Sequence, residues 1–241
     1  MRVIGKALFG SQNYSLNSPT SDMDYKVFVV PEFIDLYQMR KGDKTSLPIG
    51  YDKEHETPID FRNFDKHIRA ANCNNIELLY SKDLQVWDGN FLSYFKLARE
   101  AYANHYVAYK WDSFFSCVKG LVLNGITRYD NSEQNRMKAI TRGIWWINFL
   151  SYVAKHNFTI TNSTWSAPEV YVFPRKVRFS DDYGKVLEKE DWPAIFAEVK
   201  MITDRELAQQ SYDKLRYQQY ENELQICAQT IVADAIRKEL K

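Results

Sequence analysis

The sequence predicts an α+β protein, with a small mixed β-sheet near the N-terminus and a mainly helical C-terminal half. Up to about residue 85, short apolar runs alternate with glycine, proline and polar breaks, as is typical of strands and turns. From Phe91 onward, apolar and aromatic residues recur at intervals of three and four, as is typical of helices. We therefore expect a core at 1–85 and a helical domain at 86–241, within a chain of 241 residues.

The first strand is expected within residues 3–9, where two apolar runs end at Phe9. Gly10 and Ser11 then form a tight turn. A second strand is expected at 25–30, because it is almost wholly apolar and is ended by Pro31.

Two carboxylates open this second strand. Asp22 and Asp24 are two residues apart, so in an extended chain they point to the same face, while Met23 points into the packing. Two carboxylates on one face are suited to hold a hard cation such as Mg²⁺.

The Gly10-Ser11 turn provides the second half of such a site. Glycine allows the backbone to approach a ligand closely, and successive N–H groups with a serine hydroxyl form an anion seat. A phosphate seat beside paired carboxylates is the arrangement that phosphoryl or nucleotidyl transfer requires.

Gly10-Ser11 followed by Ser21-Asp22-Met23-Asp24 resembles the signature of the DNA polymerase beta superfamily of nucleotidyltransferases, especially its small bacterial and phage members. Residues 59–64 resemble the family's strand with a third acid, and 72–79 resemble its Asn-x-x-x-x-Glu segment. Cys73 stands where such proteins usually have proline. The resemblance covers about residues 5–81.

The resemblance implies a metal-dependent nucleotidyltransferase. Asp22 and Asp24 would bind two Mg²⁺ (or Mn²⁺) ions, Asp60 would be the third metal ligand and a possible proton acceptor, and Gly10 and Ser11 would hold the β- and γ-phosphates. A nucleoside monophosphate would pass from an NTP such as ATP to a hydroxyl of RNA, protein or a small molecule, releasing pyrophosphate.

The third acid has two candidates. Asp60 lies between Ile59 and Phe61, whose side chains would point to the packed face and leave the carboxylate on the Asp22 and Asp24 side. Glu56 has the same parity and is the rival. Asp60 is preferred, because its strand has apolar neighbours and because the family resemblance falls there.

Three cations are candidate nucleotide contacts. Lys26 shares the parity of Asp24, and Lys138 and Arg142 lie four residues apart on one face of an expected helix. An ordinary solvated surface is the alternative for the last two. Glu77 lies in an apolar segment and is expected to form a structural salt bridge, to Arg62 or Arg69.

The composition favours a cytoplasmic protein. Lys plus Arg number 32 and Asp plus Glu 31, so a strongly basic nucleic-acid-binding protein is not indicated. The three cysteines are widely spaced, as in reduced proteins, and the four histidines have no zinc-ligand spacing. No leader or membrane-spanning segment is expected.

The alternative to an enzyme is a catalytically silent protein of the same fold that binds or regulates a partner.

The remaining elements follow from periodicity and breaks. Residues 157–172 are expected to form a long connection. Helical patterns cover 32–39, 61–71, 91–121, 132–156, 192–201 and 204–240.

Overall fold

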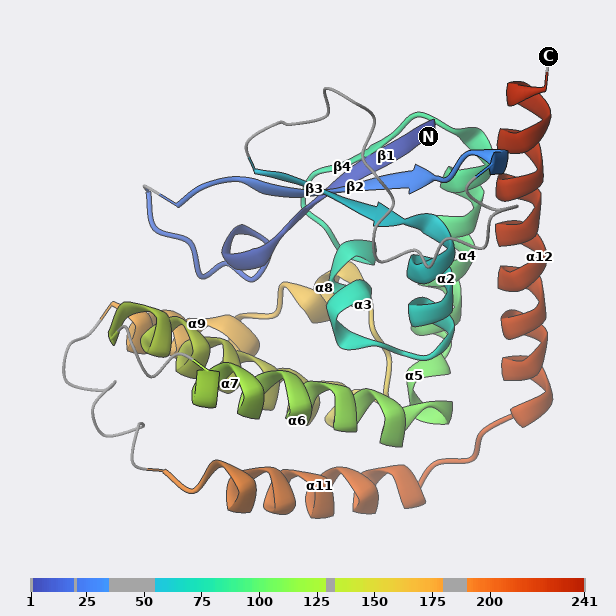
Figure 1. Ribbon diagram of the computed structural model, residues 1–241. Coiled ribbons are helices and arrows are strands. Elements are labelled where there is room, and N and C mark those ends of the chain that lie inside the picture. Colours follow the sequence, from blue (N-terminus) through green and yellow to red (C-terminus); the bar gives the residue numbers. More distant parts are fainter. Residues whose placement is uncertain (1, 20, 35–54, 129–132, 180–189, 241) are drawn as a thin grey trace. The chain divides into compact units, whose positions relative to one another are not determined.

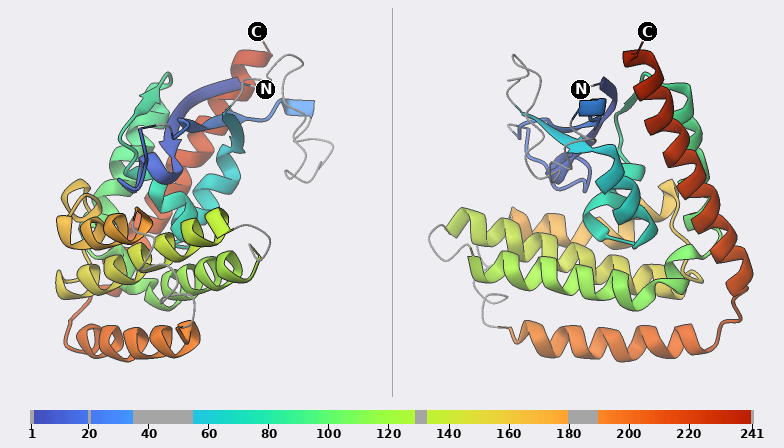
Figure 2. Two further views of the ribbon diagram at one scale, coloured as in Figure 1. Left: turned by 90° about the vertical axis from the view of Figure 1, so that its left-hand side faces the viewer. Right: turned by 45° about the vertical axis from the view of Figure 1, so that its right-hand side comes forward.

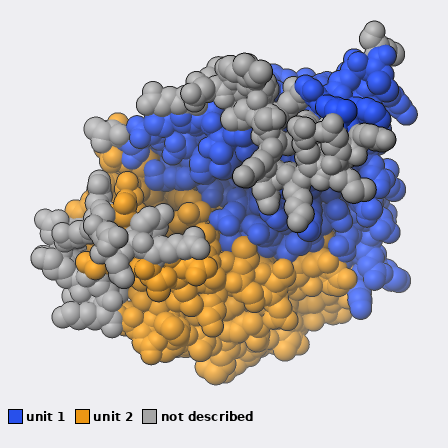
Figure 3. Space-filling model, viewed as in Figure 1, with its two compact units in different colours: residues 1–13, 20–101, 214–241 blue, residues 14–19, 102–213 orange. Residues whose placement is uncertain are grey.

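The structure is a computed structural model that describes residues 2–19, 21–34, 55–128, 133–179 and 190–240 (Figure 1). The chain forms two compact units. Unit 1 contains residues 1–13, 20–101 and 214–241, and unit 2 contains residues 14–19 and 102–213 (Figure 3).

Unit 1 is built on a mixed four-stranded sheet in the order β3-β2-β1-β4. Strand β1 pairs antiparallel with both β2 and β4, whereas β2 and β3 run parallel. The strand bounds are β1 Arg2–Phe9, β2 Asp24–Val30, β3 Glu56–Asp60 and β4 Leu84–Val86. The α+β class with a small mixed sheet is therefore confirmed.

Helices cover one face of this sheet (Figure 1). The ring of Phe28, on β2, lies with its centroid 4.8 Å from that of Phe64 and 4.9 Å from that of Phe91. These rings are fully buried, and such aromatic contacts stabilise a core beyond the area they bury. The helices of unit 1 are α2 Phe61–Arg69, α3 Cys73–Leu79, α4 Gly89–Ala103 and α12 Lys214–Glu239.

Unit 2 is helical, and α7 packs against α6, α9 and α11 (Figure 2). Its core contains the buried rings of Trp145, Trp146 and Trp165 around Tyr14, with ring centroids 4.6–6.0 Å from that of Tyr14. The bounds are α5 Tyr106–Tyr109, α6 Trp111–Arg128, α7 Glu133–Lys155, α8 Asn162–Trp165, α9 Pro168–Arg178 and α11 Trp192–Ala208.

The two units do not coincide with the expected core at 1–85 and helical domain at 86–241. Helices α4 and α12 belong to unit 1, because Phe91 and Phe95 of α4 pack on Phe28 of the sheet and α12 packs against α2. These contacts join segments far apart in sequence, and helical periodicity alone does not reveal them.

Several helix boundaries also differ from expectation. The expected connection at 157–172 contains α8 and the start of α9, because Thr161 makes a capping box and Pro168 stands in the first turn of α9. The expected helix at 91–121 is interrupted at His105, whose φ of 67° is left-handed. The break expected after Met201 falls instead between α11 and α12. Most of the expected helix at 32–39 lies outside the described residues.

None of the helices in the described ranges combines the length and apolar character that crossing a membrane requires.

Candidate active site

The turn after β1 is built around Gly10. Its φ of +80° is left-handed, a conformation that glycine adopts without a steric penalty. A Cβ placed on Gly10 would lie 3.9 Å from Oδ2 of Asp24, so this carboxylate lies close to the glycine backbone. The Gly10 N–H donates to Oε1 of Glu77 at 2.6 Å. This N–H is therefore engaged by a buried carboxylate, which corrects the expectation that it faces a phosphate.

Asn13 fixes the same turn to the end of α3. Its backbone N–H donates to the Gly10 carbonyl, its side-chain Nδ2 donates to the Glu77 carbonyl at 3.0 Å, and its Oδ1 accepts from the Lys82 N–H at 3.1 Å. Gln12 donates through Nε2 to the Ser21 carbonyl at 3.1 Å, which links the turn to the residue before Asp22. The turn is thus held by hydrogen bonds from both sides.

The β1–β2 register brings Asp24 to the turn. Asp24 is paired with Phe9, the last residue of β1 before Gly10. The Asp24 side chain is 46% exposed, and its Oδ1 lies 3.3 Å from Nδ1 of His55. Asp22 precedes β2 and is exposed. Met23 is 51% exposed, so the expectation that it points into the packing is wrong.

Lys26 lies on the same face of β2 as Asp24, as its parity predicts. Its Nζ lies 4.5 Å from the centroid of the Phe9 ring. Burial lowers the pKa of Lys26, and the Glu77 and Asp24 carboxylates partly offset that decrease. We call Gly10, Asp24, Lys26 and Glu77 the turn cluster.

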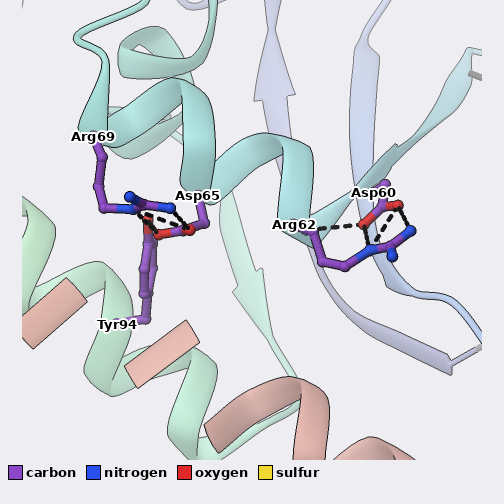
Figure 4. A network of polar contacts seen from close by, with 5 residues as sticks. All are labelled: Asp60, Arg62, Asp65, Arg69 and Tyr94. Carbon is purple, nitrogen blue, oxygen red and sulfur yellow. Dashed lines mark hydrogen bonds and ion pairs between the residues drawn. The ribbon is translucent and has the colours of Figure 1, made fainter. Parts of the chain in front are cut away.

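Asp60 has a different environment (Figure 4). It ends β3, its side chain is 1% exposed, and it accepts a hydrogen bond from the Arg62 backbone N–H at 2.9 Å. Its two oxygens also accept from the Arg62 guanidinium, the shortest contact being 2.6 Å from Nη2. Asp60 therefore caps α2, where a carboxylate is favoured by the exposed N–H groups of the helix start.

The strand register does not bring Asp60 to Asp24, which corrects the prediction that Asp60 completes the acidic set. Asp60 is paired with Val29, five residues along β2 from Asp24. At about 3.3 Å per residue, Asp60 is displaced from Asp24 by about 16 Å along the strand direction. No single metal ion could contact both carboxylates, since its ligands lie within about 2.6 Å of it.

Glu56 does not fill the position either. It is paired with Tyr25, so it lies on the face of the sheet opposite to Asp24. There it accepts from Lys6 Nζ at 3.1 Å. Tyr25 on the same face donates to Oδ2 of Asp83, and burial followed by this hydrogen bond raises the pKa of Tyr25 to about 12. Where the third carboxylate was expected, the structure places the imidazole of His55 beside Asp24.

A second set of charges runs along α2, from its cap Asp60 to its last residue Arg69 (Figure 4). The Arg69 guanidinium donates to both Asp65 oxygens at 2.8–3.1 Å, and the Tyr94 hydroxyl donates to Asp65 Oδ1 at 3.0 Å. We call Asp60, Arg62, Asp65, Arg69 and Tyr94 the helix-start cluster. A cavity of about 370 Å³ between α2 and α12 is lined by several of its residues, together with Phe61 and aliphatic and glutamine side chains of α12.

Glu77 lies in the turn cluster, whereas its expected partners Arg62 and Arg69 lie in the helix-start cluster. Arg62 pairs with Asp60 and Arg69 pairs with Asp65, whereas Glu77 accepts the Gly10 N–H near Lys26. Neither predicted salt bridge is therefore the contact that the structure shows for Glu77.

Lys138 and Arg142 both lie on α7 in unit 2. Lys138 is exposed. Arg142 donates through Nη2 to the Tyr14 hydroxyl at 3.1 Å, and its guanidinium lies 5.1 Å from the centroid of the Tyr14 ring. Their contact with a nucleotide stays a prediction.

Within the described ranges, no group of three or more histidine, cysteine, aspartate or glutamate side chains has metal-binding geometry. Asp22 and Asp24 are only two carboxylates. Mg²⁺ is commonly held by one or two carboxylates together with substrate phosphates and water. Binding of Mg²⁺ by Asp22 and Asp24 stays a prediction.

Three residues of the site were not identified from sequence. The signal for Glu77 was its position in an apolar segment, which requires a partner for a buried carboxylate. Asn13 carries no comparable signal, since asparagine is common in turns. His55 could be placed beside Asp24 only from the register of β3.

A comparison of this chain with protein-family models, with curated proteins and with solved structures found no match.

Proposed function

We propose that this chain is a metal-dependent nucleotidyltransferase, which transfers a nucleoside monophosphate from an NTP to a hydroxyl acceptor and releases pyrophosphate. The observation that carries the proposal is the close approach of the Asp24 carboxylate to the Gly10 backbone, 3.9 Å from a Cβ built on that glycine. A carboxylate and a glycine turn at this separation suit a nucleotide that presents both a cation and phosphate oxygens.

The roles of the residues follow from their positions. Asp22 and Asp24 would hold Mg²⁺ on the triphosphate, and Lys26 would balance phosphate charge beside Asp24. The N–H groups of Ser11 and Gln12 lie in the short turn Gly10–Gln12, which receives no side-chain cap from Phe9, and they would donate to phosphate oxygens in place of the Gly10 N–H. The cation would withdraw charge from the phosphates as the α-phosphorus–oxygen bond breaks.

Asp60 has no part in this proposal. The predicted set of three acids becomes a pair, because Asp60 caps α2 about 16 Å along the sheet from Asp24. The acceptor hydroxyl would attack the α-phosphorus in line, and its proton would leave to solvent.

Incorporation of label tests this function. Purified protein is incubated with each α-³²P-labelled NTP and Mg²⁺ or Mn²⁺, in the presence of an RNA oligonucleotide, of protein alone, or of hydroxylated small molecules. We expect one acceptor to become labelled, and labelling to fall at least about 100-fold in the Asp22→Asn/Asp24→Asn variant. Asp112→Asn is the matched control, because the Asp112 side chain is 88% exposed and lies in unit 2. Labelling that persists in the double variant would exclude the proposed site.

A second candidate function is nucleotide binding without transfer. It is favoured by the position of His55, whose imidazole lies beside Asp24 where a third carboxylate was expected. Equilibrium dialysis with labelled NTP and Mg²⁺ separates the two functions. Binding that depends on Asp24, with no labelled product from any acceptor, would support the silent protein.

A further inference from the structure

The outer face of α9 combines aromatic rings with positive charge. Val172, Phe173 and Phe179 are 41%, 47% and 54% exposed, and Arg175 and Lys176 are exposed as well. The opposite side of the helix is buried through Val170, Pro174 and Val177. Residues three and four apart share a face of a helix, so the exposed side chains form one surface. We call Phe173, Arg175, Lys176, Arg178 and Phe179 the α9 surface.

Helix α7 adds charge to the same end of unit 2. Asn148 of α7 donates to the Val170 carbonyl of α9, and the two helices run in opposite directions (Figure 1). The N-terminal part of α7, with exposed Lys138, therefore lies beside the C-terminal part of α9. Residues 135–142 and 170–179 contain six lysines and arginines and no aspartate or glutamate.

Arg178 is partly withdrawn from solvent at this surface. Its guanidinium lies 5.8 Å from the centroid of the Phe179 ring, and burial lowers its pKa. A guanidinium that has lost part of its hydration interacts more strongly with an anion than a fully hydrated one does.

We propose that the α9 surface, with Lys138, binds single-stranded nucleic acid. Phosphate groups would lie against the cations, and unpaired bases would stack on Phe173 and Phe179, the combination that sequence-tolerant single-strand binding uses. A duplex would keep its base faces stacked on one another and would present no unpaired base to Phe173 and Phe179. The binding surface stands without the proposed transfer, whereas a role for the bound strand as RNA acceptor rests on the proposed function.

Fluorescence anisotropy with labelled 20-nucleotide oligo(U) and oligo(dT) tests the surface. With Lys138, Arg175, Lys176 and Arg178 each contacting one phosphate, log K should fall against log salt with a slope of about −3. We expect affinity to fall at least about tenfold in Lys138→Glu/Lys176→Glu, and about tenfold for each of Phe173→Ala and Phe179→Ala. Lys155→Glu is the matched control, since this exposed lysine is in the last turn of the same helix α7, and its affinity should fall no more than about threefold.

Three outcomes would overturn the proposal. The first is equal affinity for a 20-base-pair duplex and for the single strand. The second is an equal loss of affinity in Lys155→Glu and in the charge-reversed variant. The third is binding to vesicles of phosphatidylcholine and phosphatidylserine with none to either oligonucleotide, which would make the surface a lipid-binding one. Binding to oligonucleotide with no labelled RNA in the transfer assay would support the surface and remove only its acceptor role.

Discussion

The turn cluster and the helix-start cluster of unit 1 contain the same kinds of residue and differ in how completely they are paired. In the helix-start cluster, Asp60 and Asp65 are each paired with an arginine at 2.6–2.8 Å, and their side chains are 1% and 7% exposed. In the turn cluster, the Asp24 side chain is 46% exposed and meets His55 at 3.3 Å. A buried, paired carboxylate is committed to the fold, whereas an exposed one beside a glycine turn can accept a cation.

The position of an aspartate within its strand sets the role of its carboxylate. Both clusters lie on the same unit and both contain aspartates next to a strand. Asp60 ends its strand and starts a helix, so local geometry gives its carboxylate a backbone N–H and a guanidinium. Asp24 begins its strand and has neither. Position within an element therefore separates a structural carboxylate from a candidate ligand.

The largest effect on stability is expected at Glu77, the one carboxylate of the turn cluster that is buried. Glu77→Leu would leave the Gly10 N–H without its acceptor at a site that is 2% exposed. We expect the free energy of unfolding to fall by about 3 kcal/mol, because an orphaned buried donor loses its full hydration. Urea denaturation measures the change.

Glu77→Gln is the matched control, since the amide oxygen can still accept from Gly10. Its loss should stay near 1 kcal/mol. Equal losses in the two variants would mean that the Gly10 hydrogen bond contributes nothing, and that the hydrogen bonds of Asn13 and Gln12 hold the turn.

The next effect is expected at Asp60. Asp60→Ala removes the cap of α2 and its ion pair with Arg62, and should lower the free energy of unfolding by about 2 kcal/mol. Nucleotide binding by the folded protein should be unchanged. Asp60→Asn, which keeps a capping oxygen, should lose about half as much. An Asp60 variant of normal stability that no longer binds nucleotide would show that Asp60 belongs to the nucleotide site, so that buried pairing would no longer distinguish a structural carboxylate from a ligand.

Sequence reasoning located the turn and the first two strands but not the partners of the acids. The apolar runs and Gly10 sufficed to predict β1, β2 and the turn between them, because these signals are local. The face and position of Asp60 depend on the pairing of Tyr25 with Glu56, and parity within one strand carries no information on its register with the next. The partners of Glu77 and of α12 are contacts across 67 residues or more, which no local pattern encodes.

A smaller effect is expected from Tyr94 in the helix-start cluster. Tyr94→Phe removes the buried hydrogen bond to Asp65 Oδ1 and leaves the Arg69 pair in place. The free energy of unfolding should fall by about 1 kcal/mol. Tyr171→Phe, at a partly exposed tyrosine of α9, should change it by less than about 0.5 kcal/mol. Similar losses of unfolding free energy in Tyr94→Phe and Tyr171→Phe would show that the Tyr94 hydrogen bond adds nothing to the pairing of Asp65 with Arg69.

The smallest effect on stability, and the most informative, is expected at Asp24. Asp24→Asn keeps the size of a side chain that is 46% exposed, so the free energy of unfolding should change by less than about 0.5 kcal/mol. Binding of NTP with Mg²⁺ should nevertheless fall at least about tenfold, because an amide is a much weaker ligand for this cation than a carboxylate. Calorimetric titration with and without Mg²⁺ measures this directly. A carboxylate whose loss costs binding and spares the fold is a ligand, whereas a loss of stability like that of Asp60→Ala would make Asp24 one more structural acid and leave the turn cluster without a cation site.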